Sequence, residues 1–413
     1  MSVSPTTSTA SAGWRSPLII IICGSLIGML TFGPRSSFGF FMQPMSKEFL
    51  WGRDVFALAV AIQNLLWGLG QPFAGAVADK FGSVRVLCVG AILYAAGLIM
   101  MRDASSPVVL DLSAGVLIGF GLSGCSFNLV LSAFTKLVPE EWRGIALGAG
   151  TAAGSFGQFL FAPFGVAMID NLGWQSALTV FAILTLLVVP LAFALRTPPA
   201  DSAPSAAMPA QSLRQALAEA FGHRSYVLLV TGFFTCGFQL AFITVHLPAY
   251  LVDRGMSTQS GGWVLATIGL FNIVGSLGAG YLQSRMPKRY LLSAIYFTRA
   301  MSTVGLLLLP MNLTSALFFA VITGLTWLST VPPTSALVSL MFGARWMAML
   351  YGFAFFSHQV GGFLGVLLGG LVFEYAGSYT PVWILSVFFG VMSALINLPI
   401  VEKPVERAVP QPA

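Results

Sequence analysis

Hydrophobic residues occur along this chain in long blocks that short polar segments separate. A helix needs about 20 apolar residues to cross a bilayer, and the blocks reach that length twelve times. The first six predicted spans are 17–44, 54–78, 84–101, 108–137, 144–169 and 175–195. The second six are 225–251, 259–283, 290–310, 313–341, 346–374 and 380–400. The pattern therefore predicts an all-α membrane protein with twelve transmembrane helices.

The same pattern divides the chain into two halves of six spans each. Residues 197–223 are rich in Pro, Ala and Ser and then become weakly amphipathic, which predicts a cytoplasmic linker with a short surface helix. We expect one six-helix bundle at 17–196 and another at 224–402, with cytoplasmic tails at 1–16 and 403–413. Because the first tail lacks the basic start and the cleavage site of a signal peptide, we expect a disordered tail and a retained first span.

Composition and charge distribution support a membrane location. Hydrophobic residues make up 56% of the chain and charged residues 8%, whereas soluble domains carry about 25% charged residues. Of the 20 Lys and Arg residues, fourteen fall on the side of the predicted tails, four on the other side and two within spans. The positive-inside rule then predicts cytoplasmic termini, and we expect a bacterial inner membrane. The net charge of +6 is therefore interpreted as loop charge and not as a nucleic-acid site.

The two halves resemble each other in sequence. "QPFAGAVADKFGSVRVL" closes the second span and "SLGAGYLQSRMPKRYLL" closes the eighth, with Gly75 and Gly280 lying 205 residues apart. At a shift of 204, "GQFLFAPFGVAMIDNLG" aligns with "GGFLGVLLGGLVFEYAG". Parallel six-helix halves are typical of secondary transporters, which bind their substrates between the halves near the midplane. The repeat thus predicts two pseudo-symmetric bundles that need only one chain to function.

The loop after the second span, "GAVADKFGSVR", resembles the signature loop of the major facilitator superfamily. The resemblance implies the twelve-helix major facilitator fold and rocker-switch alternating access. In physical terms, Gly75 permits close helix approach, and a carboxylate at Asp79 can pair with basic groups while the inner side is shut. We therefore expect the cytoplasmic gate to use Gly75, Asp79, Gly82, Arg85 and Arg143. The alternative is that these are ordinary loop charges.

A narrower resemblance begins in the first span. "GPRSSFGFF" followed by "SKEF" is similar to the first helix of the monocarboxylate and oxalate–formate branch, and "CGFQLAFITVHLPAYL" resembles bacterial permeases of that branch. In the monocarboxylate transporters the basic residue at this point faces the cavity and binds substrate, which implies the same role for Arg35. The Asp and Arg of that family's eighth helix align here with Asn272 and Ser276, so a second cationic anchor is missing.

Two arginines fall inside predicted spans. A charge at the bilayer centre costs roughly 2.5–3.5 kcal/mol on insertion scales, which disfavours a lipid-facing position for Arg35. Its guanidinium can bind a carboxylate through two parallel hydrogen bonds, although Arg35 could instead extend to the outer surface. Arg299 lies ten residues beyond Arg289 and therefore at mid-membrane. It is predicted either to bind substrate or to make an internal structural bond.

The remaining candidate site residues are uncharged or titratable. His246 precedes a helix-kinking Pro248. It is predicted either to donate a hydrogen bond to the substrate or to carry the coupled proton, because histidine titrates near neutral pH. The alternative is a neutral histidine that bonds two helices, and His358 is a weaker candidate of the same kind. Polar side chains within spans either contact the substrate or bond neighbouring helices. The amides predicted in this way are Asn64, Asn128, Gln158, Gln239 and Gln359.

These features favour a secondary transporter of a small organic anion, in the first instance a monocarboxylate, with a co-transported proton as one coupling scheme. The alternative is an aromatic or heterocyclic solute, such as a riboflavin-like vitamin or a drug, because aromatic side chains crowd the same spans. No nucleophile–base pair, metal-type cluster or phosphate-binding Gly-Lys-Ser/Thr motif is present, so we expect no enzyme activity, cofactor or metal. The four cysteines lie in apolar runs and predict neither disulfides nor a zinc site.

Overall fold

The computed structural model describes residues 15–197, 213–343 and 347–405. Within these ranges every regular element is helical. The helices of the first half are α1 Pro17–Ser36, α2 Met42–Phe49, α3 Arg53–Phe81, α4 Ser83–Arg102, α5 Pro107–Leu110, α6 Ile118–Gly124, α7 Phe127–Leu137, α8 Glu140–Leu172, α9 Trp174–Leu186 and α10 Val188–Ala192. Those of the second half are α11 Leu213–Gly222, α12 Arg224–Asp253, α13 Thr258–Leu282, α14 Lys288–Leu308, α15 Leu313–Thr326, α16 Val331–Phe342, α17 Met347–Ala376 and α18 Thr380–Asn397.

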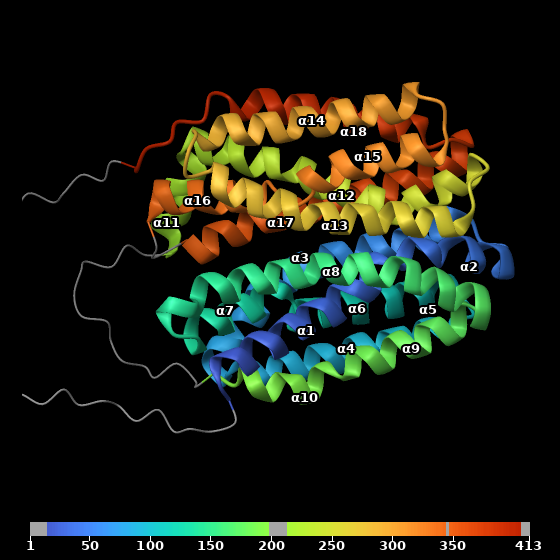
Figure 1. Cartoon of the computed structure of the whole chain (residues 1–413), viewed down its shortest axis with the longest axis horizontal. Helices are drawn as coiled ribbons and strands as arrows, with labels where there is room; N and C mark the ends of the chain where they lie inside the picture. Colours follow the sequence, from blue (N-terminus) through green and yellow to red (C-terminus); the bar gives the residue numbers. More distant parts are fainter. Residues whose placement is uncertain (1–14, 198–212, 344–346, 406–413) are drawn as a thin grey trace, which may run out of the picture.

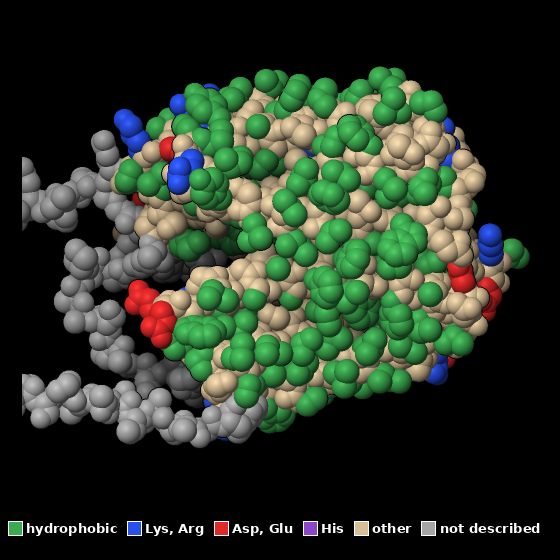
Figure 2. Space-filling model, viewed as in Figure 1, with side chains coloured by type: hydrophobic (Ala, Val, Ile, Leu, Met, Phe, Trp, Pro, Cys, Tyr) green, Lys and Arg blue, Asp and Glu red, His purple; other side chains and the backbone are tan. Residues whose placement is uncertain are grey.

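Twelve helical segments of the described chain are long and apolar enough to cross a membrane, which confirms the predicted all-α class with twelve spans. Four of these spans are built from several helices, among them the sixth, which consists of α9, α10 and a 3₁₀ turn at Phe193–Leu195. The first includes a 3₁₀ turn at Phe38–Phe40, and the fourth runs from α5 through a π-helical stretch at Asp111–Leu117 to α7. The tenth consists of α15 and α16. Figure 2 shows hydrophobic side chains over the long flank of the molecule and charged ones near its two ends.

The two halves lie against each other as two layers of helices (Figure 1). Between the layers α3 packs on α17 and α8 packs on α13. Each half has its own hydrophobic core, with Tyr94 and Phe134 among the buried residues of the first and Tyr226 and Trp383 among those of the second. The spans of each half therefore pack mainly with one another, and the interface between halves is formed by a few long helices.

Both ends of the described chain lie at one end of the bundle, which we call the termini end (Figure 1). Arg15 donates from Nε to the carbonyl of Ala194 at 3.1 Å, so the start of the first span is held beside the end of the sixth. The amide of Val405 donates to the carbonyl of Met341 at 2.9 Å. The opposite end, where α2 lies, is called the far end.

The fourth and tenth spans are interrupted at equivalent points of the repeat. Helix α6 ends at Gly124 and α7 begins at Phe127, while α15 ends at Thr326 and α16 begins at Val331. Pro332 and Pro333 follow the second break, and proline cannot donate a backbone hydrogen bond to the preceding turn. Free carbonyl groups at such a break need other donors when they are buried.

Glycines allow α12 and α17 to approach closely. A Cβ atom on Gly237 would overlap the carbonyl oxygen of His358, and one on Gly361 would overlap the carbonyl of Phe234. Small residues at helix interfaces are a common means of close packing in membranes. The contact fixes the position of α17, whose residues line the site described below.

We predict that Gly237→Ala destabilises the purified protein, because overpacking a tight contact costs about 1–3 kcal/mol. The measurement is the melting temperature in detergent. Gly278→Ala is the matched control, since a Cβ atom there meets nothing within 4 Å, and it should not lower the melting temperature. An unchanged melting temperature for Gly237→Ala would contradict the close packing of these two helices.

Candidate functional site

A cavity of about 220 Å³ lies between the two halves. Its lining comes from the first, second, fourth and fifth spans on one side and the seventh, eighth, tenth and eleventh on the other. The lining extends toward the termini end through Leu131, Val331 and Tyr351. Figure 2 shows the surface hollowed between the halves at that end. The cavity therefore opens at the termini end, along both interrupted spans.

Arg35 brings a positive charge into this cavity from the last turn of α1. The residue is 8% exposed, and its Nη2 donates to the side-chain oxygen of Asn64. Its Nε is buried and has no hydrogen-bond partner, and its guanidinium carbon lies 5.0 Å from the ring centroid of Trp67. None of the described lining residues is Asp or Glu. Among the described lining residues the guanidinium thus has no counter-charge, and its Nε remains without an acceptor.

Neutral polar groups surround Arg35. Asn64 donates from Nδ2 to the carbonyl of Val60 at 2.8 Å. The backbone carbonyl of Asn64 accepts from Gln359 Nε2 at 3.2 Å, across the interface between halves. Asn128 lines the cavity and is half-buried. Gln158 also lines it, and its Oε1 is buried without a partner. Of the predicted amide groups, the structure therefore brings four to the cavity.

Arg299 does not line the cavity. It is fully buried and donates to the carbonyl of Thr326 and, at 3.0 Å, to that of Trp327. It also donates to Gln239 Oε1 at 3.2 Å, while Gln239 Nε2 donates to the carbonyl of Ser386 at 3.0 Å. The structure thus places Arg299 and Gln239 behind the break of the tenth span, where the guanidinium satisfies carbonyls that have left the helix. Of the two predicted roles for Arg299, this geometry favours the structural one.

His246 also lies away from the cavity lining. Its ring is fully buried, with Nε2 2.8 Å from the carbonyl of Val366 and Nδ1 3.4 Å from the hydroxyl of Tyr379. The ring therefore connects α12 with α17 and with the start of α18. This is the geometry of a histidine that bonds helices, which the sequence left open as the alternative to proton coupling.

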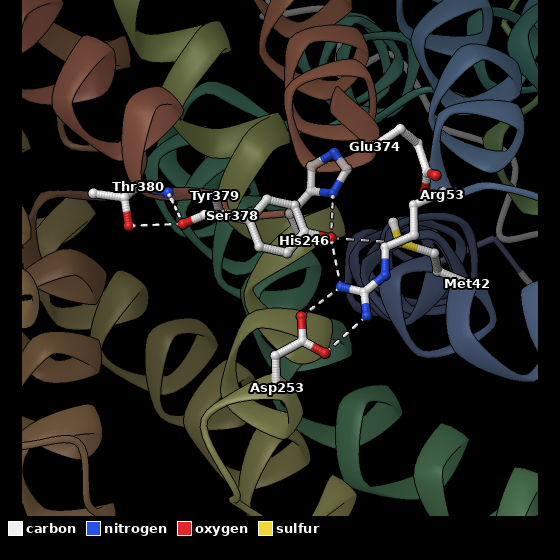
Figure 3. Close-up of polar contacts among 8 residues, drawn as sticks. All are labelled: Met42, Arg53, His246, Asp253, Glu374, Ser378, Tyr379 and Thr380. Atoms are coloured by element: carbon white, nitrogen blue, oxygen red, sulfur yellow. Dashed lines mark hydrogen bonds and ion pairs between the residues drawn. The ribbon is translucent and has the colours of Figure 1, made fainter. Parts of the chain in front are cut away.

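A charged network closes the far end, and we call it the far-end lock (Figure 3). Arg53 donates to both carboxylate oxygens of Asp253, at 2.6 and 2.7 Å, and to the hydroxyl of Tyr379 at 3.0 Å. Its backbone amide donates to Glu374 at 2.6 Å, and its guanidinium carbon lies 3.9 Å from the ring centroid of Phe373. These contacts join α3 of the first half to α12 and α17 of the second.

The residues predicted to form a cytoplasmic gate lie at the termini end. Gly82 ends α3 with φ of +89°, a conformation that favours glycine. Arg85 is exposed, and Arg143 donates to the carbonyl of Val138 at 3.3 Å within its own half. A Cβ atom on Gly75 would meet nothing within 4 Å, and the side chain of Asp79 lies outside what the structure describes. The predicted gate therefore remains an expectation for a state in which this end is shut.

Trp67 and Tyr351 line the cavity although sequence reasoning did not select them. A signal was available on the eleventh span, because Tyr351, Phe355, His358 and Gln359 follow the spacing of one helix face. Trp67 lies three residues after Asn64 and hence on the same side of α3. Both side chains add aromatic surface to the lining of the cavity.

Residues 24–366 match the family described as Major Facilitator Superfamily. The chain belongs to the major facilitator superfamily. It is 31% identical over 385 residues to the "uncharacterized MFS-type transporter YcxA" of Bacillus subtilis (strain 168), covering 91% of this chain and 93% of that protein. It is 25% identical over 407 residues to monocarboxylate transporter 13 of Rattus norvegicus, covering 95% and 91% of the two chains.

Solved structures show the same fold. A bacterial homologue of the human lysosomal transporter Spinster, described as inward-facing and unoccupied, matches with a TM-score of 0.74 at 17% identity and covers 92% of this chain and 96% of its own. A D-xylose–proton symporter matches with a TM-score of 0.73 at 16% identity and covers 93% and 98%. The predicted major facilitator fold is confirmed, and the chain is a multi-pass membrane protein of a transporter superfamily.

We predict that Arg299→Gln lowers the melting temperature by about 5 °C, because each buried carbonyl left unpaired costs about 1–3 kcal/mol. The measurement is thermal unfolding of the purified protein in detergent. Arg254→Gln is the control, since Arg254 is exposed at the far end. If Arg299→Gln retained full stability but lost ligand binding, the structural role would be wrong.

Proposed function

We propose that this protein is a secondary transporter of a small monocarboxylate. The observation that carries the proposal is the buried guanidinium of Arg35, which has a free donor in a cavity whose described lining contains no acidic residue. A carboxylate supplies the missing negative charge and accepts two hydrogen bonds in one plane. The similarity to proteins named as monocarboxylate transporters, at 22–25% identity, supports the same substrate class.

Transport would proceed by alternating access in the bacterial inner membrane. With the termini in the cytoplasm, as the distribution of Lys and Arg favours, the cavity opens inward and the far-end lock closes the outer side. The outward-open state requires the lock to separate and the halves to close at the termini end. The predicted residues around Gly75 and Arg143 lie at that end and would act there. One chain contains the complete cavity, so a monomer suffices.

We predict that Arg35→Gln reduces carboxylate transport by roughly tenfold or more, since hydrogen bonds to charged groups contribute about 1.5–3 kcal/mol. The measurement is counterflow of labelled lactate and benzoate in proteoliposomes. Arg35→Lys keeps the charge but loses the planar pair of donors, and should retain part of the activity. Arg254→Gln should transport at the normal rate. Transport of both acids by Arg35→Gln at the normal rate would refute the assigned substrate class.

We predict that Asp253→Asn opens the far end. A cysteine placed at Thr244 in a variant without native cysteines reports access to the cavity, and its labelling by a membrane-impermeant maleimide from the outside should rise several-fold. The reason is that Arg53 loses its charge partner between the halves. The double exchange Arg53→Asp with Asp253→Arg should restore slow labelling.

Arg102→Gln provides the matched control for this experiment. Arg102 pairs with the adjacent Asp103, within one half, at 2.8 Å. Loss of that pair should leave labelling unchanged. Equal labelling of these three variants and of the parent protein with the cysteine at Thr244 would remove the lock from the transport mechanism.

A further inference from the structure

Five ring side chains form a continuous surface along the cavity, which we call the aromatic wall. It consists of Trp67, Phe355, His358, Phe233 and Tyr351, all of which line the cavity. Successive ring centroids are 5.7 Å apart for Trp67 and Phe355 and 5.8 Å for Phe355 and His358. They are 5.1 Å apart for His358 and Phe233 and 6.2 Å for Phe233 and Tyr351. The rings of Phe355 and His358 are nearly parallel, with an interplanar angle of 8°.

The charged and the aromatic parts of the cavity meet at Trp67. The Arg35 guanidinium carbon lies 5.0 Å from the Trp67 ring centroid. The wall therefore begins beside Arg35, the only described lining residue with a permanent charge. The indole nitrogen of Trp67 is buried without a hydrogen-bond partner, as is Nε of Arg35. Two donors from different spans therefore lack a partner in the protein, and a carboxylate has two oxygens to offer.

A hydrogen-bond chain fixes the middle of the wall. Gln359 Nε2 donates to the carbonyl of Asn64 at 3.2 Å, which turns its Oε1 toward His358 Nδ1 at 3.0 Å. Because Oε1 is an acceptor, Nδ1 carries the proton and donates. The imidazole ring is thus held nearly parallel to Phe355, and the orientation of these two rings of the wall is fixed without a ligand.

We infer that the substrate is an aromatic monocarboxylate, whose carboxylate binds at Arg35 and Trp67 and whose ring lies against Phe355 and His358. This inference rests on the proposed transport of monocarboxylates and narrows it. A short aliphatic acid would bind the donors but leave the wall without a partner. A neutral aromatic solute would cover the wall but leave the Arg35 charge uncompensated in a buried position.

The test is equilibrium binding to the purified full-length protein by titration calorimetry, with benzoate, cyclohexanecarboxylate and benzamide as probes. Aromatic contacts of this kind add about three- to tenfold in affinity beyond the area buried. Benzoate should therefore bind about three- to tenfold more tightly than cyclohexanecarboxylate, and benzamide more weakly than either. Phe355→Leu should abolish the preference for benzoate, and Phe355→Tyr should retain it.

Phe353→Leu is the matched control on the same helix. Phe353 is exposed and does not line the cavity, so this variant should keep the preference. The elution profile and melting temperature of each variant establish that it is folded. If benzoate and cyclohexanecarboxylate bind equally well, and Phe355→Leu changes neither, the aromatic wall does not select substrate although the monocarboxylate function stands. If benzamide binds as tightly as benzoate and Arg35→Gln changes neither, the monocarboxylate function itself is wrong.

Discussion

The burial of the Arg35 charge is the constraint on which the site depends. A guanidinium keeps its proton in a protein, so the charge remains when the side chain leaves water. Asn64, its hydrogen-bond partner, is neutral, and the described lining of the cavity offers no carboxylate. Such a charge is stabilised either by water in the cavity or by an anion that replaces the water. The proposed preference for anions therefore rests as much on the absence of acids in the described lining as on the arginine.

Arg299 shows that the same side chain can serve a different purpose. Its donors are occupied by the carbonyls of Thr326 and Trp327, which the break of the tenth span releases from regular helix. The break in turn allows Trp327 and Leu328 to line the cavity. One arginine thus maintains the shape of the cavity from behind, and Arg35 supplies its charge from within. What distinguishes them is the supply of backbone acceptors around each group.

The fold could be predicted from the sequence because span length and hydropathy record how many helices cross the membrane. Depth along a span was also predictable, since Arg35, Asn64 and Gln359 reach the cavity as expected. The face of the helix on which each side chain lies was not predictable from a single residue. Under the 205-residue shift the counterpart of Arg35 is Leu240, which lines the cavity. Gln239 is one residue earlier and, at about 100° per residue, points elsewhere. Only several residues at helical spacing, as on the eleventh span, reveal a face.

The far-end lock and the cavity both lie at the interface between the two halves, at different depths along it. A ligand shifts an equilibrium only by the difference in its affinity for the two states. The proposed aromatic acid, held by Arg35 and Trp67 on one half and by Phe355 and His358 on the other, would bind best when the halves approach at the cavity. In the proposed mechanism, that approach would close the termini end and separate the two sides of the lock. The side chains of Arg53 and Asp253 are 15% and 30% exposed, and ion pairs that water reaches contribute about 0–1 kcal/mol. The ion pair of the lock is therefore weak enough that the binding energy of a small anion would exceed its contribution.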